Sequence, residues 1–158
     1  MPHNMAHIVM EQLESSFQSA DAYAASLLSL EKFEKYLSAP ATPRNKLVKN
    51  IVDVRSVLPR PEDRNNILSD FFIYSKASNS IINHTSAYLR PEYYYEALFK
   101  IPGYDYDAWD NKIINNTDYY DIISANNGEV ILYSKRISFN ARFQGRVIYT
   151  LSKDRIMD

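Results

Sequence analysis

The sequence has 158 residues, of which 46% are hydrophobic and 23% are charged, and its net charge is −1. This length suits one domain of ordinary size, and the near-zero charge gives no electrostatic basis for binding nucleic acid. Cysteine is absent, which excludes disulfides, thiolate nucleophiles and cysteine-based zinc sites. No apolar run is long enough to span a membrane and no signal-peptide pattern is present, so the segment as given is expected to be soluble.

The N-terminal part, residues 7–63, is expected to be helical, after a tag or linker remnant at residues 1–6. From residue 7 to residue 37, apolar side chains recur with a period near 3.6 residues and no Gly or Pro intervenes. This pattern predicts a single helix about 45 Å long. Prolines end it, and a second helix is predicted over residues 47–58, where apolar side chains again share one face.

From residue 64 the pattern changes to that of strands. Residues 67–75 are rich in β-branched and aromatic side chains, and residues 80–83 are the expected partner in a hairpin. Near the C-terminus, the turn signal Asn126-Asn127-Gly128 introduces an alternating strand. The remaining predictions are a strand at 129–139, a turn at 143–145, a last strand at 146–152 and a short strand at 119–123.

Two short helices are predicted between these strands. Pro91 is well placed to begin one of them, because proline is tolerated at the first helical position. Asp105 or Asp107 is expected to cap the other. Strands joined by hairpins, with helices alongside, indicate an α+β fold with an antiparallel sheet. Residues 64–158 would form this sheet region.

Catalytic signatures are missing from the sequence, so an enzyme is the least favoured of the function classes. His84 is the one histidine within the expected folded part, and no nucleophile, phosphate-loop or zinc motif is present. Asp105, Asp107 and Asp110 have oxygen atoms that suit a cation. The glycine and glutamate of a calcium loop are absent, however, so helix capping is the favoured interpretation. No metal or cofactor is expected.

Tyrosine is the unusual component of the composition. The chain has 13 Tyr against 3 Gly, and eight of the tyrosines lie between Tyr88 and Tyr120. They could cover one face of the sheet, or they could line a site for a small polar molecule, since a tyrosine combines an apolar ring with a terminal hydroxyl. The three consecutive tyrosines from Tyr93 to Tyr95 cannot all point inwards from one helix, so at least one should be exposed.

Three stretches on either side of the Tyr/Trp-rich insert carry a family pattern. They are I-L-S-D-F-F-I-Y-S-K-A-S-N-S-I-I-N-H-T-S, N-N-G-E-V-I-L-Y-S-K-R-I and G-R-V-I-Y-T-L-S-K-D-R-I. Together they resemble a Cache domain, the PAS-like extracytoplasmic module of bacterial receptors. The resemblance implies an antiparallel sheet of about five strands packed against a long N-terminal helix, with the first hairpin at its centre.

A narrower resemblance comes from the succession of F-F-I-Y-S-K-A-S-N-S-I-I-N, R-P-E-Y-Y-Y-E and Y-D-A-W. It is similar to the ectodomains of membrane-anchored AraC-type transcription regulators of Gram-positive bacteria, over residues 8–158. In Cache domains the ligand lies between the sheet and the inserted segment. The resemblance therefore implies six ligand-binding residues: Tyr74, Tyr88, Arg90, Tyr94, Trp109 and Tyr133. Arg90 could hold a carboxylate, or it could be a surface residue.

The resulting hypothesis is an extracellular sensor domain of a transmembrane receptor, with an AraC-type transcription regulator as the favoured class. It would bind a sugar, organic acid or similar molecule, and attach to the membrane through segments outside this chain. The alternative is a ligand-free spacer or dimerisation module of the same receptor class, with a homodimer formed through the N-terminal helix.

Overall fold

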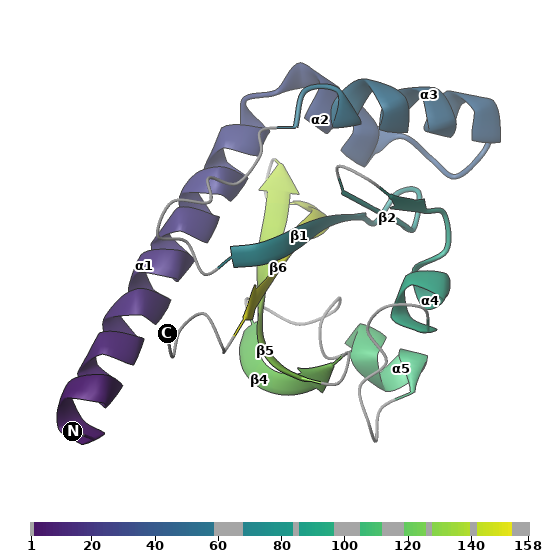
Figure 1. The fold of residues 1–158 in the computed structure, drawn as a ribbon. Helices are drawn as coiled ribbons and strands as arrows, with labels where there is room; N and C mark the ends of the chain where they lie inside the picture. Colours follow the sequence, from purple (N-terminus) through teal and green to yellow (C-terminus); the bar gives the residue numbers. More distant parts are fainter. Residues whose placement is uncertain are drawn as a thin grey trace.

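The computed structural model describes residues 2–58, 68–83, 86–96, 105–111, 119–125, 128–139 and 142–152. It shows an α+β fold in which three N-terminal helices lie against one side of an antiparallel sheet and two short helices lie near its other side (Figure 1). The prediction of an α+β fold with an antiparallel sheet is confirmed.

The helical region contains α1 (Pro2–Leu28), α2 (Glu31–Ser38) and α3 (Arg44–Arg55). The prediction of one continuous helix over residues 7–37 is wrong, because α1 ends at Leu28. Leu30 has an extended backbone (φ −91°, ψ 119°) and precedes α2 without a side-chain cap. No helix among the described residues is both long enough and apolar enough to cross a membrane.

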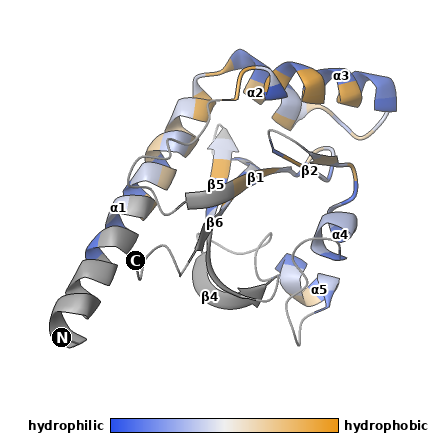
Figure 2. Ribbon diagram, viewed as in Figure 1, coloured by the Kyte–Doolittle hydropathy of each residue, from blue (hydrophilic) through white to orange (hydrophobic). Residues whose placement is uncertain are grey.

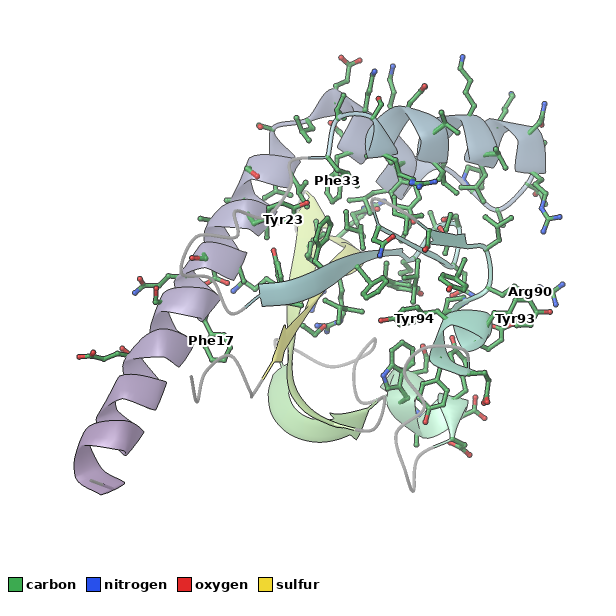
Figure 3. The ribbon with its side chains drawn as sticks, viewed as in Figure 1. Phe17, Tyr23, Phe33, Arg90, Tyr93 and Tyr94 are labelled. Atoms are coloured by element: carbon green, nitrogen blue, oxygen red, sulfur yellow. The ribbon has the colours of Figure 1, made fainter. Side chains whose placement is uncertain are left out.

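The break after α1 has a packing explanation. Phe33, Tyr36 and Leu37 of α2 are completely buried, and the change of direction at Leu30 lets these side chains pack on β1 and β6. Phe33 points from α2 towards the sheet (Figure 3). Helix propensity is a weak preference that tertiary packing overrides. In α1, Phe17, Ala20, Tyr23, Ala24 and Leu27 pack against this core. The hydroxyl of Tyr149 in the sheet also donates a hydrogen bond to the Ala20 carbonyl oxygen (2.7 Å).

The sheet has the strand order β3-β2-β1-β6-β5-β4, with every pairing antiparallel. Five strands have three residues or more, and β3 is a two-residue edge strand that the sequence pattern did not indicate. The strands are β1 (Leu68–Ser75), β2 (Ser80–Ile82), β3 (Ala87–Tyr88), β4 (Tyr119–Ala125), β5 (Gly128–Phe139) and β6 (Arg142–Ser152). The expected hairpin of β1 and β2 is confirmed, with Ser75 opposite Ser80.

The turn predicted at residues 143–145 is wrong, because these residues belong to β6. A register shift separates the Ile137–Gly145 and Ser138–Phe143 pairs, which leaves Gln144 as the extra residue of a bulge. Gly145, the next residue, allows β6 to lie close to β1. It lies opposite Ser75, and a Cβ atom at this position would overlap the Tyr74 carbonyl oxygen.

Side chains alternate along the central strands and build two cores. Phe71 and Ile73 of β1, with Val147 of β6, pack against α1, α2 and α3. Phe72 and Tyr74 of β1, with Ile148 of β6, face the opposite side. Hydrophobic residues recur along α2 and α3 (Figure 2), and their buried members complete the first core. The central strands β1 and β6 are therefore covered on both faces.

A buried polar network joins α2 to the β1–β2 turn. The Tyr36 hydroxyl lies 2.7 Å from the Ser80 hydroxyl, which lies 2.7 Å from the Ser78 hydroxyl. All three residues are almost completely buried. Asn79, in the same turn, has a left-handed backbone (φ 51°), which asparagine tolerates better than most residues. The helical layer thus holds the turn through hydrogen bonds as well as through apolar contact.

Gly145→Ala is expected to destabilise the protein by more than about 2 kcal/mol, because the new methyl group would force β6 away from β1. Urea denaturation followed by circular dichroism measures the change. Ser138→Ala, at an exposed position of the neighbouring strand, should stay within about 0.5 kcal/mol. Equal stability of Gly145→Ala and wild type would contradict the close approach.

Tyr36→Phe is expected to cost about 1–2 kcal/mol, because it removes a buried hydroxyl from the serine network. The matched control is Tyr93→Phe, which removes a hydroxyl from a tyrosine that is 57% exposed. Chemical denaturation of the two variants should separate them clearly. A loss of the same size in both would show that the network around Ser80 adds nothing to stability.

Candidate functional site

The described helices of the insert between β3 and β4 pack on the second face of the sheet. Within it, α4 (Pro91–Tyr94) begins at a proline and α5 (Tyr106–Trp109) is capped by Asp105, whose carboxylate accepts a hydrogen bond from the Ala108 amide (2.8 Å). Both predicted helix starts are confirmed. The capping interpretation of Asp105 is also confirmed.

An aromatic cluster connects this insert to the sheet. We use this name for Phe72, Tyr74, Tyr88, Tyr94, Tyr95, Tyr106 and Trp109. The ring centroids of Tyr94 and Phe72 are 4.4 Å apart, and those of Tyr95 and Trp109 are 5.2 Å apart. Tilted and edge-on contacts at these separations are favourable beyond the area that they bury. The cluster therefore holds the described helices of the insert against β1 and β3.

Four of the six predicted site residues belong to this cluster: Tyr74, Tyr88, Tyr94 and Trp109. Tyr94 and Trp109 are each 1% exposed, and Tyr88 at the sheet edge is half-buried, with its ring 5.6 Å from that of Tyr94. The structure therefore brings these four together. Tyr133 lies on β5, opposite Tyr149 of β6, and its side chain is outside the described residues.

Arg90 lies apart from the other described candidates. Its guanidinium carbon is 5.8 Å from the centre of the Tyr93 ring, and its Nη1 donates a hydrogen bond to the Tyr93 hydroxyl (3.3 Å). Arg90 is exposed, Tyr93 is 57% exposed, and both point away from the sheet while Tyr94 points towards it (Figure 3). This arrangement matches the surface alternative for Arg90. It also confirms that one of the three consecutive tyrosines is exposed.

The hydroxyl of Tyr74 lies at the polar end of the cluster. It donates to the Asn79 side-chain oxygen at 3.4 Å, a long hydrogen bond. Burial, followed by the negative charge of Asp110, raises the pKa of Tyr74 to about 12. Burial and then Asp110 also raise the pKa of Tyr106. The two hydroxyls and the Asp110 carboxylate therefore interact electrostatically at this end of the cluster.

Arg146 is the charged residue that the sequence pattern did not single out. It lies opposite Tyr74 in the β1–β6 ladder, so the two side chains share the face that the insert covers. Arg146 is 1% exposed, and its Nη1 donates to the Ser134 hydroxyl at 3.2 Å. Because a buried guanidinium is uncommon, Arg146 is the strongest marker of a polar site on this face. The only sequence signal for Arg146 was its position directly before the apolar residues of the last predicted strand.

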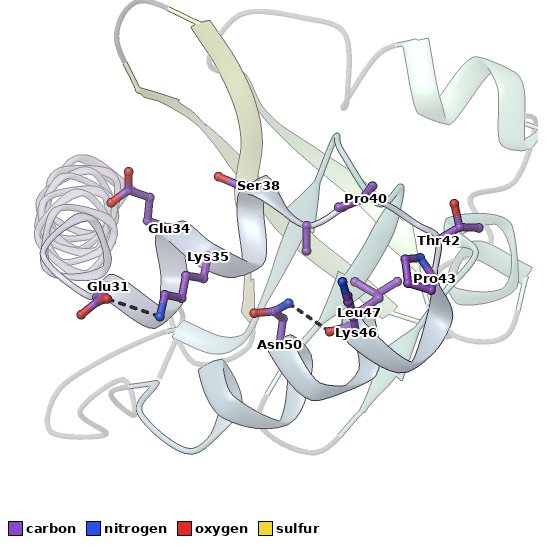
Figure 4. Close-up of a pocket in the computed structure, with 11 residues that line it drawn as sticks. Glu31, Glu34, Lys35, Ser38, Pro40, Thr42, Pro43, Lys46, Leu47 and Asn50 are labelled. Carbon is purple, nitrogen blue, oxygen red and sulfur yellow. Dashed lines mark hydrogen bonds and ion pairs between the residues drawn. The ribbon is translucent and has the colours of Figure 1, made fainter.

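Two grooves lie elsewhere on the described surface, and none of the six predicted residues lines either of them. One, of about 650 Å³, runs between α1 and β5, where Asp21 and Lys135 form an ion pair at 3.5 Å. The other, of about 480 Å³, lies between α2 and α3 (Figure 4). Among the described residues, no group of His, Asp or Glu side chains is arranged to hold a metal ion. His84 lies outside them.

No protein-family model matches the chain, and comparisons with curated proteins and with solved structures found no match. The geometry of the sheet face and its insert is therefore the basis for any functional proposal.

Stability is expected to fall as the pH rises above about 10. The pKa of Tyr74 is about 12 in the folded protein, against about 10 in an unfolded chain. A raised pKa means that this contribution to stability is complete below pH 10 and is lost as the pH approaches 12. Urea denaturation from pH 8 to pH 11, followed by the fluorescence of Trp109, the single tryptophan, measures this loss.

Tyr74→Phe should make the alkaline decline of the unfolding free energy shallower, because the group that resists ionisation is gone. Tyr93→Phe, at an exposed position, should leave the decline unchanged. Identical pH profiles for Tyr74→Phe and wild type would contradict the burial of this hydroxyl.

Proposed function

We propose that this chain is the ligand-sensing domain of a bacterial transmembrane receptor, of the PAS-like Cache type that its sequence resembles. The ligand is a small polar molecule held between the sheet and the Tyr-rich insert. The observation that carries this proposal is the buried guanidinium of Arg146 beside Tyr74, on a sheet face covered by aromatic side chains. An apolar aromatic wall with a few convergent polar groups is typical of small-molecule sites.

The proposed anchor for the ligand is Arg146, with Tyr74 and Ser134 as neighbouring hydroxyls. A guanidinium has five N–H donors in a planar fork, and this fork suits carboxylate and other oxygen-rich groups. Ser134 accepts a hydrogen bond from one of these donors. Organic acids are therefore favoured over sugars within the proposed ligand class. Arg90, on the outer surface, is not part of the proposed anchor.

Binding at this site would require the aromatic cluster to rearrange. Tyr94, Tyr95 and Trp109 are each 1% exposed, so the ligand replaces ring contacts with the sheet. The described part of the insert has two short helices of four residues each, and such elements open more readily than the long strands beneath them. Movement of the insert is thus the proposed conformational response.

The signal would reach the helical layer through the β1–β2 turn. On one side, the Tyr74 hydroxyl contacts Asn79 of this turn, and on the other side Ser80 contacts Tyr36 of α2. The proposed route from Tyr74 to α2 therefore runs through Asn79 and along the backbone to Ser80. A free-energy difference of about 1–3 kcal/mol between the two receptor states is typical of such coupling.

A second candidate function is that of a dimerisation module. It is favoured by large apolar side chains on the surface of the helical layer: Leu28 at the end of α1 is 44% exposed, and Val48 and Val52 of α3 are 42% and 58% exposed. Val48 and Val52 are one helical turn apart and share a face. Sedimentation velocity over a range of protein concentrations separates a ligand-binding monomer from a ligand-free dimer.

A thermal-shift screen of organic acids and sugars tests the sensing proposal. At least one organic acid is expected to raise the melting temperature saturably, because binding to the folded state alone stabilises it. Arg146→Lys and Tyr74→Phe should each weaken that ligand's binding about tenfold or more, the size expected for losing a hydrogen bond to a charged group. Quenching of Trp109 fluorescence gives the affinities.

Arg90→Lys is the matched control, since it makes the same exchange on the outer surface. Near-ultraviolet circular dichroism identifies variants that keep the wild-type fold, and Tyr74→Phe is the smallest change among them. A flat screen, or a ligand whose affinity depends on Arg90 while Arg146→Lys and Tyr74→Phe bind normally, would refute the proposed site.

A further inference from the structure

A row of polar side chains crosses the centre of the sheet on the face that carries the insert. Arg146 of β6 lies opposite Tyr74 of β1 on one side and opposite Arg136 of β5 on the other. Directly opposite residues of antiparallel strands point to the same face, and their Cα atoms are about 5 Å apart. Two guanidinium groups therefore extend from neighbouring positions on one face of the sheet.

The neighbours of Arg136 along β5 show which face it occupies. Lys135 forms an ion pair with Asp21 of α1 (3.5 Å), and Ile137 belongs to the core beneath the helical layer. Because side chains alternate along a strand, Arg136 points to the opposite face, which carries the insert. Residues 135–138 also line the groove beside α1, and within them Lys135 and Ile137 are the residues that face the helices.

The two guanidinium groups differ in exposure. Arg146 is 1% exposed and donates a hydrogen bond from Nη1 to the Ser134 hydroxyl (3.2 Å), whereas Arg136 is exposed to solvent. Ser134 is two residues before Arg136 on the same strand and therefore shares its face. An anion bound here would contact a buried guanidinium, a hydroxyl and an exposed guanidinium together.

The two positive charges at opposite positions favour an anion with more than one negative charge. Like charges directly opposite each other destabilise a pair of strands, and the removal of a guanidinium from water adds to this cost. An anion held by both groups turns the repulsion into attraction. Asp110, the second cause of the raised pKa of Tyr74 after burial, acts on the other end of the row.

We propose that Arg136 and Arg146 together bind the phosphoryl group of a phosphate monoester with an aromatic body. The inference rests on the function proposed above and narrows its ligand class. A phosphate monoester has a charge of about −1.5 to −2 at pH 7 and three acceptor oxygens, so one group can accept hydrogen bonds from both guanidiniums. A carboxylate has a single charge and is matched by one guanidinium fork. The ring of the ligand lies among the aromatic side chains that contact the insert.

Isothermal titration calorimetry compares three probes that share one aromatic ring. Phenyl phosphate has the doubly charged group, methyl phenyl phosphate is the diester with one charge, and benzoate has one planar carboxylate. Phenyl phosphate is expected to bind at least about fivefold more tightly than either of the others, the size of one additional exposed ion pair. This preference should shrink from about pH 7.5 to about pH 5, because the second pKa of a phosphate monoester is about 6.

The variant Arg136→Gln assigns the second charge. It should weaken the binding of phenyl phosphate about fivefold and leave benzoate and methyl phenyl phosphate unchanged, whereas Arg146→Lys should weaken all three. Lys135→Gln is the matched control, because it removes the adjacent cation on the other face of the strand, and it should bind like wild type. Near-ultraviolet circular dichroism verifies that each variant keeps the wild-type fold.

Three results would overturn this inference: equal affinities for phenyl phosphate and benzoate, an unchanged affinity of Arg136→Gln for phenyl phosphate, and an equal loss in Lys135→Gln. If benzoate binds in these cases and Arg146→Lys weakens it, the sensing proposal stands and the phosphoryl inference alone fails. If no probe binds in a way that Arg146→Lys weakens, the phosphoryl inference again fails, and the organic-acid screen decides the sensing proposal separately.

Discussion

The pairing of β1 with β6 is the constraint on which the rest of the structure depends. These two strands lie at the centre of the sheet and supply side chains to both cores. At Gly145 there is no room for a side chain, because a Cβ atom would overlap the Tyr74 carbonyl oxygen and touch the Leu37 side chain. The absence of a Cβ atom thus allows β6, β1 and α2 to pack together at this point.

The β1–β2 turn contacts both the helical layer and the aromatic cluster. Tyr36 reaches it from α2 through Ser80, and Tyr74 reaches it from the aromatic cluster through Asn79. A buried hydrogen-bonded network specifies one arrangement because any displacement leaves polar groups unpaired. The turn therefore contacts both layers, the helical layer through Ser80 and the aromatic cluster through Asn79.

The sequence correctly predicted the features that depend on interactions between neighbouring residues. The hairpin of β1 and β2, the start of α4 at Pro91 and the cap at Asp105 follow from β-propensity, proline geometry and side-chain capping. The break at Leu30 and the bulge at Gln144 were missed because packing against the sheet produces them. Neither the turn residues nor the helical period contains that information, so periodicity extended α1 too far and Gly145 was assigned to a turn.

The same reasoning explains why Arg90 attracted attention and Arg146 did not. An arginine beside proline and tyrosines resembles an anchor, whereas an arginine within a strand resembles a solvated residue of its outer face. In the structure Arg146 is buried and Arg90 is exposed. The burial of Arg146 depends on the insert, which lies far from it in the sequence. Removing a guanidinium from water is costly, and an apolar residue of similar size would often stabilise the fold as well or better. Stability alone therefore does not require an arginine at this position, and this is the reason for proposing Arg146 as a ligand anchor.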